Sequence, residues 1–280
     1  MGYIRRTLQV TLFQLRRELL SKRTIVLFLI IGIFIYSNME PVAVFCAAVG
    51  IKATPLGFVH MINDFIFQTV FMLGILFLLS SAPFRGDFYP YIVYRSGDKE
   101  WETGNILYIF IMTFLYTVFL VIISMIGLKG RIDFVCEWGK IWGTLARTNA
   151  ASQYGVQFAV SDYIIGKYEP LYAMVVSFLL EWICFIWVGM CIYFVNILTK
   201  KAVGVFLAGI FVFLDAMIYN SWTPWAYRFS PVTLSHLSAF TKGYVYYGIT
   251  LQYAWRFFGI TIIGFIVGTI LLTKKVRDYE

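Results

Sequence analysis

Charged residues are scarce in this chain of 280 residues: they make up 14% of it, whereas hydrophobic residues make up 60%. Soluble domains have about 25% charged and about 45–50% apolar residues. In water, this composition would leave apolar surface uncovered, and several runs approach the roughly 20 apolar residues that cross a hydrocarbon core. These proportions exclude a disordered chain, a disulfide-stapled secreted domain and a soluble enzyme. They predict a membrane protein that crosses the bilayer several times.

The sequence also lacks the common motifs of catalytic and nucleotide-binding sites. It has two histidines and contains no H-E-x-x-H, no G-x-S-x-G and no G-x-x-x-x-G-K-[ST]. We therefore expect no catalytic site, no cofactor and no metal in this chain, so that any energy source is a partner chain or an ion gradient. None of the four cysteines forms a C-x-x-C pair, and a disulfide between Cys46 and Cys136 outside the membrane stays open.

Six apolar runs have about the length of a membrane span. We place them at residues 24–38, 62–82, 104–127, 171–197, 202–220 and 254–273, and expect Glu40–Pro41 to end the first. The charged and polar residues 129–169 are predicted to form an extracytoplasmic segment with short helices. Little chain is left over, so residues 1–280 are predicted to form a single all-α transmembrane domain.

The basic residues are distributed unevenly over the loops, which indicates the orientation of the chain. With both termini in the cytoplasm, 14 of the 23 lysines and arginines lie on the cytoplasmic side. Of the other nine, five fall in residues 129–169, and long loops count least. We therefore predict an even number of spans, cytoplasmic termini and a multi-pass position in the plasma membrane. The net charge of +8 then reflects topology and contact with anionic lipid rather than a nucleic-acid partner.

Residues 1–23 are predicted to form an amphipathic helix in the cytoplasmic headgroup layer. Its apolar residues recur every three or four positions, at Ile4, Leu8, Leu12, Leu15 and Leu19. Six basic residues occupy much of the remainder, as is typical of interfacial helices. A plain cytoplasmic extension of the first span is the alternative.

The densest charged cluster beyond the N-terminus lies between the second and third spans. Residues 94–101 read YRSGDKEW, and Arg-Ser-Gly-Asp is turn chemistry. Trp101 is typical of an anchor at the water–lipid boundary. We expect a short helix, a sharp turn and a second helix start that present a compact surface of mixed charge to a cytoplasmic partner. A solvated loop is the alternative interpretation.

The segment before the last span, residues 221–253, is rich in aromatic residues and is interrupted by Pro224 and Pro231. It is too broken to cross the bilayer as a helix. Re-entrant helices at membrane depth are one interpretation, because such backbone is tolerated where protein shields it. An aromatic belt at the outer interface is the other.

Four ionisable residues lie within the outer halves of the predicted spans or at their edges: Asp64, Glu181, Asp215 and Arg256. An unpaired charge inside a membrane costs several kcal/mol. Arg256 would therefore pair with Glu181 or Asp215, or else all four would line an outer vestibule. The series of acids through the bilayer that a proton-coupled carrier needs is absent.

This layout resembles the membrane subunit of ABC-2-type transporters. Those permeases have a basic amphipathic N-terminal helix, six spans, re-entrant helices before the last span, and a first cytoplasmic loop with an Arg–turn–Lys–x–Trp stretch, present here as residues 94–101. Residues 129–169 depart from the family's usual brief link between spans three and four. The resemblance implies the permease subunit of an ATP-driven exporter.

The resemblance also implies partners for this chain. In that family the first loop contains a coupling helix that sits in a groove of the ATP-binding subunit. By resemblance, that docking role falls on Arg95, Asp98, Lys99, Glu100 and Trp101. ATP and Mg would be bound by that partner chain, and a second permease copy or a sister permease would complete the transporter.

The cargo is less well indicated than the partners. The spans contain many aromatic residues and few midplane charges, which favours a hydrophobic or amphipathic substrate such as a peptide. Two functions from other classes stay open: a non-transporting membrane immunity or sensor subunit, and an ion-coupled carrier.

Overall fold

A computed structural model describes residues 2–86, 88–220, 223–240 and 249–277. Within these ranges the chain is helical and contains no strand. In chain order the α-helices are α1 (Tyr3–Leu19), α2 (Lys22–Val49), α3 (Gly57–Ile62), α4 (Phe65–Leu78), α5 (Tyr89–Ser96), α6 (Asp98–Ile126), α7 (Gly139–Arg147), α8 (Ala150–Tyr154), α9 (Asp162–Lys167), α10 (Pro170–Thr199), α11 (Gly204–Asn220), α12 (Pro231–Ser235) and α13 (Leu251–Arg277). Two 3₁₀ helices, η1 (Pro224–Phe229) and η2 (Leu237–Phe240), flank α12.

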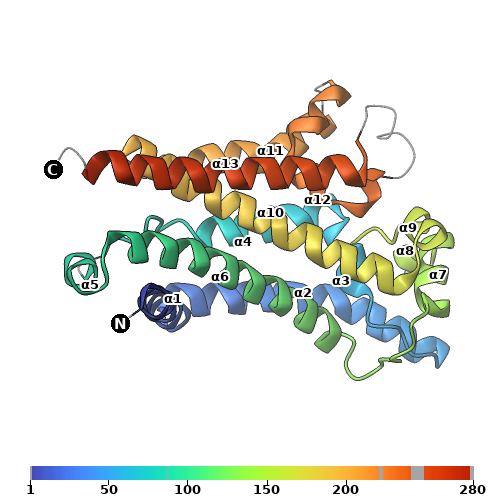
Figure 1. Cartoon of the computed structure of the whole chain (residues 1–280). Helices are drawn as coiled ribbons and strands as arrows, with labels where there is room; N and C mark the ends of the chain where they lie inside the picture. The colour runs from blue at the N-terminus through green and yellow to red at the C-terminus, as the bar shows by residue number, and fades with distance from the viewer. Residues whose placement is uncertain (1, 87, 221–222, 241–248, 278–280) are drawn as a thin grey trace.

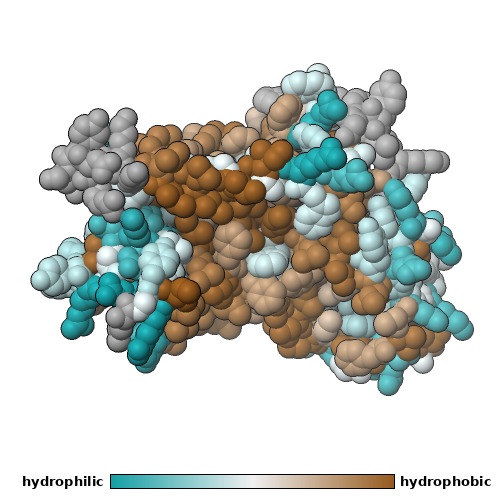
Figure 2. Space-filling view, in the orientation of Figure 1, coloured by the Kyte–Doolittle hydropathy of each residue, from teal (hydrophilic) through white to brown (hydrophobic). Residues whose placement is uncertain are grey.

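Four of these helices, α2, α6, α10 and α13, are long and apolar enough to cross a membrane. They run roughly side by side (Figure 1), and the apolar surface forms a belt between two more polar ends (Figure 2). The expectation of an all-α chain with several helices of membrane-crossing length is confirmed. Helices α4 and α11 are apolar but shorter, with 14 and 17 residues, so the count of six spans stays a prediction.

Helix α2 is longer than the sequence led us to expect, because it does not end at Glu40–Pro41. Pro41 lies inside it, and the helix ends at Gly50, whose φ of 71° stops it. A proline inside a helix removes one backbone hydrogen bond. Met39 and Val42, on either side of Pro41, are fully buried in the core, and this packing holds the helix together. At 28 residues, α2 is about 42 Å long and extends beyond a hydrocarbon core of about 30 Å.

The run predicted as the second span is divided into α3 and α4. Asp64 separates them: its side-chain oxygen accepts hydrogen bonds from the backbone N–H groups of Ile66 (3.0 Å) and Phe67 (3.2 Å). An aspartate in this position satisfies the free N–H groups of a new helix. The continuous helix therefore begins at Phe65 rather than near residue 62, and it ends at Leu78 rather than near residue 82.

Helix α10 occupies the centre of the bundle, between α6 on one side and α11 and α13 on the other (Figure 1). It is the most buried of the four long helices, whereas α2 and α13 turn broad apolar faces outward. The four helices therefore build one core around α10 and leave a largely apolar outer surface.

Helix α1 lies across the ends of the long helices and is seen nearly end-on in Figure 1, beside α5. Its apolar residues Ile4, Leu8 and Leu12 are exposed, whereas the polar residues on the opposite face pack against the start of α6. At Gly104 of α6 a Cβ atom would lie 2.7 Å from Val10, so glycine permits this close approach. A helix with an outward apolar face at the end of the bundle fits the predicted position in the headgroup layer.

Residues 129–169 form the expected short helices α7, α8 and α9, at the end of the bundle opposite the two termini (Figure 1). We call them the outer cap. Trp142 donates a hydrogen bond from Nε1 to the carbonyl oxygen of Thr54 (2.9 Å), which ties α7 to the loop before α3. Cys46 is buried, Cys136 is exposed and both are free, so the disulfide left open by the sequence is not formed.

His60 in α3 is fully buried beneath the outer cap. Its ring centroid lies 5.5 Å from that of Trp138 and 5.0 Å from that of Trp142. Neither ring nitrogen has a hydrogen-bond partner among the described residues. Burial lowers the pKa of His60 to about 3, so the imidazole is neutral at physiological pH.

Replacing His60 by phenylalanine tests this burial. The folded protein holds the imidazole neutral, whereas the unfolded chain binds a proton there below pH 6.5. The stability of the folded protein therefore decreases as the pH is lowered from about 6.5 to about 3. A single such group contributes at most about 1.4 kcal/mol per pH unit. In His60→Phe this contribution is absent, so thermal unfolding in detergent is expected to depend less on pH than in the wild type. Identical pH dependences in both proteins would contradict the burial of a neutral imidazole.

Candidate functional site

The loop between α4 and α6 has the predicted geometry of a short helix, a sharp turn and a second helix. Gly97 ends α5 and begins α6, with a φ of 97° that favours glycine. A Cβ atom there would lie 2.5 Å from Oε2 of Glu100. Asp98 and Glu100 fall in the first turn of α6, where negative charge stabilises a helix. The turn is therefore tightly specified by local chemistry.

The five predicted docking residues are close in sequence but differ in exposure. Arg95 and Lys99 are exposed, and Asp98 is partly exposed. Glu100 faces α1 and lies 3.9 Å from Arg6. Trp101 is 1% exposed, so it is not the anchor at the water–lipid boundary that the sequence led us to expect.

Trp101 instead holds the turn in place from inside. Its ring packs edge-on against Tyr89 of α5, with 5.2 Å between the ring centroids. The guanidinium of Arg85 lies over the Tyr89 ring, 5.1 Å from its centroid. These contacts join the first turn of α5 to the first turn of α6, so the two helices are packed together at the turn.

Helix α5 carries exposed aromatic side chains. Tyr91 and Tyr94 are 73% and 93% exposed, and the exposed Arg95 follows them. Exposed aromatic residues beside an arginine are the composition that interface hot spots favour. We call Tyr91, Tyr94, Arg95 and Lys99 the docking surface. The apolar spacing of α5 is visible in the sequence, but the exposure of its aromatic face is not.

A buried polar network lies directly behind this turn. The carboxylate of Glu102 accepts a short hydrogen bond from the hydroxyl of Tyr193 in α10, and lies 3.8 Å from the guanidinium of Arg85. Asn105 accepts a hydrogen bond from Gln14 of α1 (3.1 Å) and donates a long one to Tyr193 (3.5 Å). The network thus joins α1, α6 and α10 immediately below the docking surface.

Sequence analysis did not find this network. Its members are isolated polar residues in four different segments, and the spacing within any one segment gives no motif. Glu102 stands in a loop crowded with other charges, and Tyr193 is one of 19 tyrosines. The sequence does contain one indication of the network: Glu102 and Asn105 lie three residues apart and hence on one face of α6.

The four ionisable residues of the outer half do not form the ion pairs that we expected. Arg256 is exposed, and within the described ranges it pairs with neither acid. Glu181 accepts a hydrogen bond from Nε2 of Gln68 (2.8 Å), and Asp215 accepts one from the hydroxyl of Thr233. Opposite charges are thus replaced by neutral hydrogen-bond donors.

Both acids are linked to α12, the short buried helix before the last span. Thr233 belongs to α12, and Gln68 also donates to the hydroxyl of Ser235 at its end (3.0 Å). Glu181 is fully buried and Asp215 is 7% exposed. Asp64 has a different role, because it begins α4 and accepts a hydrogen bond from Ala159 of the outer cap (3.0 Å). The four residues therefore do not form one site.

Comparisons of the chain with protein-family models, with curated proteins and with solved structures found no match. The resemblance to ABC-2-type permeases accordingly rests on the layout of the chain and on residues 94–101.

The polar network can be tested by removing one hydroxyl. In Tyr193→Phe the buried carboxylate of Glu102 loses its donor, and the loss of such a bond costs about 1–3 kcal/mol. We expect a lower midpoint of thermal unfolding in detergent.

Tyr108→Phe is the matched control for this substitution. Tyr108 is equally buried in α6, but its hydroxyl has no hydrogen-bond partner among the described residues. Its removal is expected to leave the midpoint unchanged or slightly raised. Equal destabilisation by both variants would show that the Glu102–Tyr193 bond does not position the helices.

Proposed function

We propose that this chain is the membrane-spanning permease subunit of an ATP-driven exporter in the plasma membrane. The observation that carries the proposal is the docking surface on α5 and the start of α6. It lies at the same end of the bundle as both described ends of the chain (Figure 1), and its aromatic residues contact nothing that would bury them. By resemblance, a separate ATP-binding subunit binds ATP and Mg and docks there.

The contacts behind the docking surface support a coupling role. Within the proposed set, Arg95, Asp98 and Lys99 contact the partner, whereas Glu100 and Trp101 hold the turn against α1 and α5. A displacement of the turn is passed to α10 through Glu102 and Tyr193, because a short buried hydrogen bond joins these two helices. ATP-driven closure of the partner would in this way move the central helix.

The outer half of the bundle supports a role in transport more weakly. Glu181 and Asp215 lie where α12 packs between α10 and α11, and we propose that this short helix belongs to a re-entrant segment. Residues 221–222 and 241–248 of that segment lie outside the described residues. We propose six spans, with α4 and α11 completing the four long helices. The apolar outward face of α13 is available to a second permease copy or a sister permease. The cargo is proposed to be hydrophobic or amphipathic, such as a peptide.

A second candidate, a non-transporting immunity or sensor subunit, is favoured by the outer cap. Helix α7 is bonded to the loop before α3, α8 packs against α2 and α9 packs against α7, and such a folded segment offers a surface for an extracellular ligand. Nothing comparable favours an ion-coupled carrier, because the buried acids are bonded to neutral side chains of the outer half.

Substitutions in the docking surface separate these functions. We expect Tyr94→Ala combined with Arg95→Ala to weaken binding of a co-expressed ATP-binding subunit about tenfold or more, because exposed aromatic and arginine anchors dominate interface energies. Co-purification stoichiometry and the rate of ATP hydrolysis in the complex measure the effect.

The matched control is Tyr163→Ala combined with Arg147→Ala. These residues are also exposed, but they lie in the outer cap at the opposite end of the chain's long helices. The control is expected to assemble and hydrolyse ATP as the wild type does. Normal assembly and normal coupled hydrolysis in the Tyr94/Arg95 variant would contradict the docking role.

A further inference from the structure

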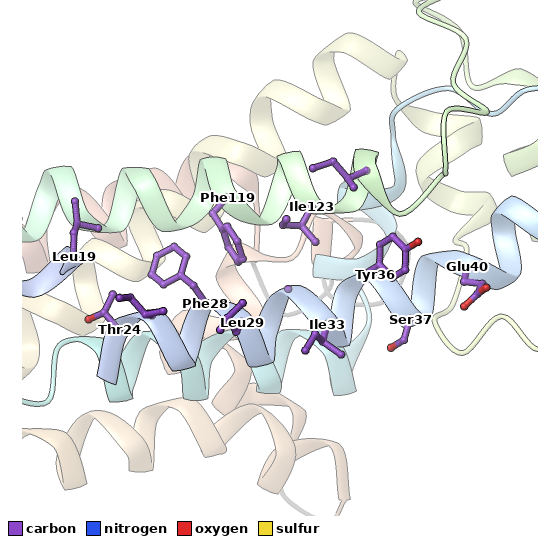
Figure 3. A pocket seen from close by; sticks show the side chains of 13 residues that line it. Leu19, Thr24, Phe28, Leu29, Ile33, Tyr36, Ser37, Glu40, Phe119 and Ile123 are labelled. Carbon is purple, nitrogen blue, oxygen red and sulfur yellow. The ribbon is translucent and has the colours of Figure 1, made fainter. Parts of the chain in front are cut away.

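An open groove runs along the outer surface between α2 and α6 (Figure 3). Its volume is about 570 Å³, within the range of about 300–1,000 Å³ typical of small-molecule sites. Phe28, Leu29 and Ile33 of α2 and Phe119 and Ile123 of α6 line it, and the rings of Phe28 and Phe119 are in contact, with 4.6 Å between their centroids. Gly32 forms part of its floor, where a Cβ atom would lie 3.4 Å from the Phe119 ring.

The groove is elongated and largely apolar. From Thr24 to Glu40 it follows 16 residues of α2, or about 24 Å at 1.5 Å per residue. Apart from Thr24, Tyr36, Ser37 and Glu40, the residues that line it carry no polar side-chain atom. An extended acyl chain can lie along such a surface.

The outer end of the groove carries one charge of each sign. Nζ of Lys129 lies 2.6 Å from Oε1 of Glu40 and 5.7 Å from the ring centroid of Tyr36. Both charged side chains are open to solvent: 41% of the Lys129 side-chain surface and 48% of the Glu40 side-chain surface are exposed. The hydrogen bond to Glu40 raises the pKa of Lys129, which keeps the amine charged. An ion pair exposed to solvent contributes little to stability, so either member can exchange its partner.

We propose that this groove binds one acyl chain of a phospholipid whose headgroup carries both a phosphate and a primary ammonium. Lys129 donates to the phosphate, Glu40 accepts from the ammonium, and the chain lies along Ile33, Gly32 and Leu29. A quaternary choline group lacks the N–H donors that Glu40 requires. An uncharged glycerol headgroup leaves the carboxylate of Glu40 without a cationic partner. This site is independent of the proposed export function, because it needs neither an ATP-binding partner nor a cargo.

Gly32 lies within the reach of an acyl chain whose headgroup is at Glu40, whereas the part of the groove nearer Thr24 lies beyond that reach. A leaflet is half of a hydrocarbon core of about 30 Å, so one chain reaches about 15 Å inward from the headgroup. Gly32 lies eight residues, or about 12 Å, below Glu40 along α2. A bulky side chain at Gly32 would therefore block the path of the acyl chain without touching the charged end.

Titration with lipids of identical acyl chains, followed by native mass spectrometry of the purified protein, tests the proposal. The probes are phosphatidylethanolamine, phosphatidylcholine and phosphatidylglycerol. We expect one phosphatidylethanolamine to bind about tenfold more tightly than either other lipid, the effect of one charge-assisted hydrogen bond. Glu40→Gln is expected to remove this preference, and Lys129→Gln to weaken binding of all three lipids.

Two further variants block the groove itself. Gly32→Phe fills its floor, and Ile33→Trp, at a position that is 67% exposed, narrows it with less risk to packing. Both variants are expected to weaken the binding of all three lipids. Asp162→Asn is the matched control, since Asp162 is an exposed acid that pairs with Arg147 at 2.6 Å in the outer cap, away from the groove. It is expected to bind lipids as the wild type does.

Several outcomes would overturn the proposal. Equal affinities for the three lipids, or an ethanolamine preference that survives Glu40→Gln, would show that the charged pair does not select the headgroup. A protein dimer that Ile33→Trp dissociates, without bound lipid, would assign the groove to a second copy of this chain. These lipid measurements do not depend on whether an ATP-binding partner docks to the chain. The lipid site and the export function can therefore be disproved independently.

Discussion

Hydrogen bonds between buried polar side chains join the helices of this protein within its apolar layer, where lipid offers such groups no partner. These bonds lie at two levels. Near one end, Glu102 is bonded to Tyr193 and Asn105 to Gln14; nearer the other end, Glu181 is bonded to Gln68. Each bond joins two different helices. The positions of α1, α4, α6 and α10 relative to one another therefore follow from a small number of hydrogen bonds.

These bonds complement apolar packing, which is weakly directional. In a bilayer the surrounding lipid tails are as apolar as leucine, so burying an aliphatic side chain between helices gains little. Hydrogen bonds and close backbone contacts then decide which faces meet. The contact of α1 with α6 shows both, with Gly104 permitting the approach and Thr11 donating to its carbonyl oxygen at 3.1 Å. A helix lying across the bundle end is thereby attached to the helix that begins at the turn.

Much of the architecture could be predicted from the sequence, because it depends on local composition. Long apolar runs located α10 and α13 to within four residues at each end, and Arg-Ser-Gly-Asp located the turn at Gly97. The run predicted at 104–127 located the end of α6, but α6 begins six residues earlier, at Asp98. The continuation of α2 past Pro41 could not be predicted in this way, because it depends on the burial of Met39 and Val42 by distant segments.

The environment of individual site residues was harder to predict than the elements that carry them. Trp101 has the position of an interfacial anchor in the sequence, but in the structure it is buried and packs against Tyr89. Arg256 was expected to neutralise a buried acid. In the folded chain the neutral side chains of Gln68 and Thr233 donate hydrogen bonds to the two acids instead, and no charge pattern in the sequence marks these donors. Hydrogen-bond partners that are uncharged and far apart in the sequence produce no periodic pattern from which their contact could be predicted.

The length of α2 has a consequence for the outer cap. The helix continues for nine residues beyond Glu40, and Phe45 near its end packs against Tyr154 of α8, with ring centroids 4.9 Å apart. A continuous helix behaves as a stiff rod, so the height of the cap above the bilayer is set by where α2 enters it. Bilayers of different thickness impose hydrophobic mismatch on such a rod, which tilts or drags its ends to compensate. The cap would then rise, sink or lean with the thickness of the membrane that surrounds the protein.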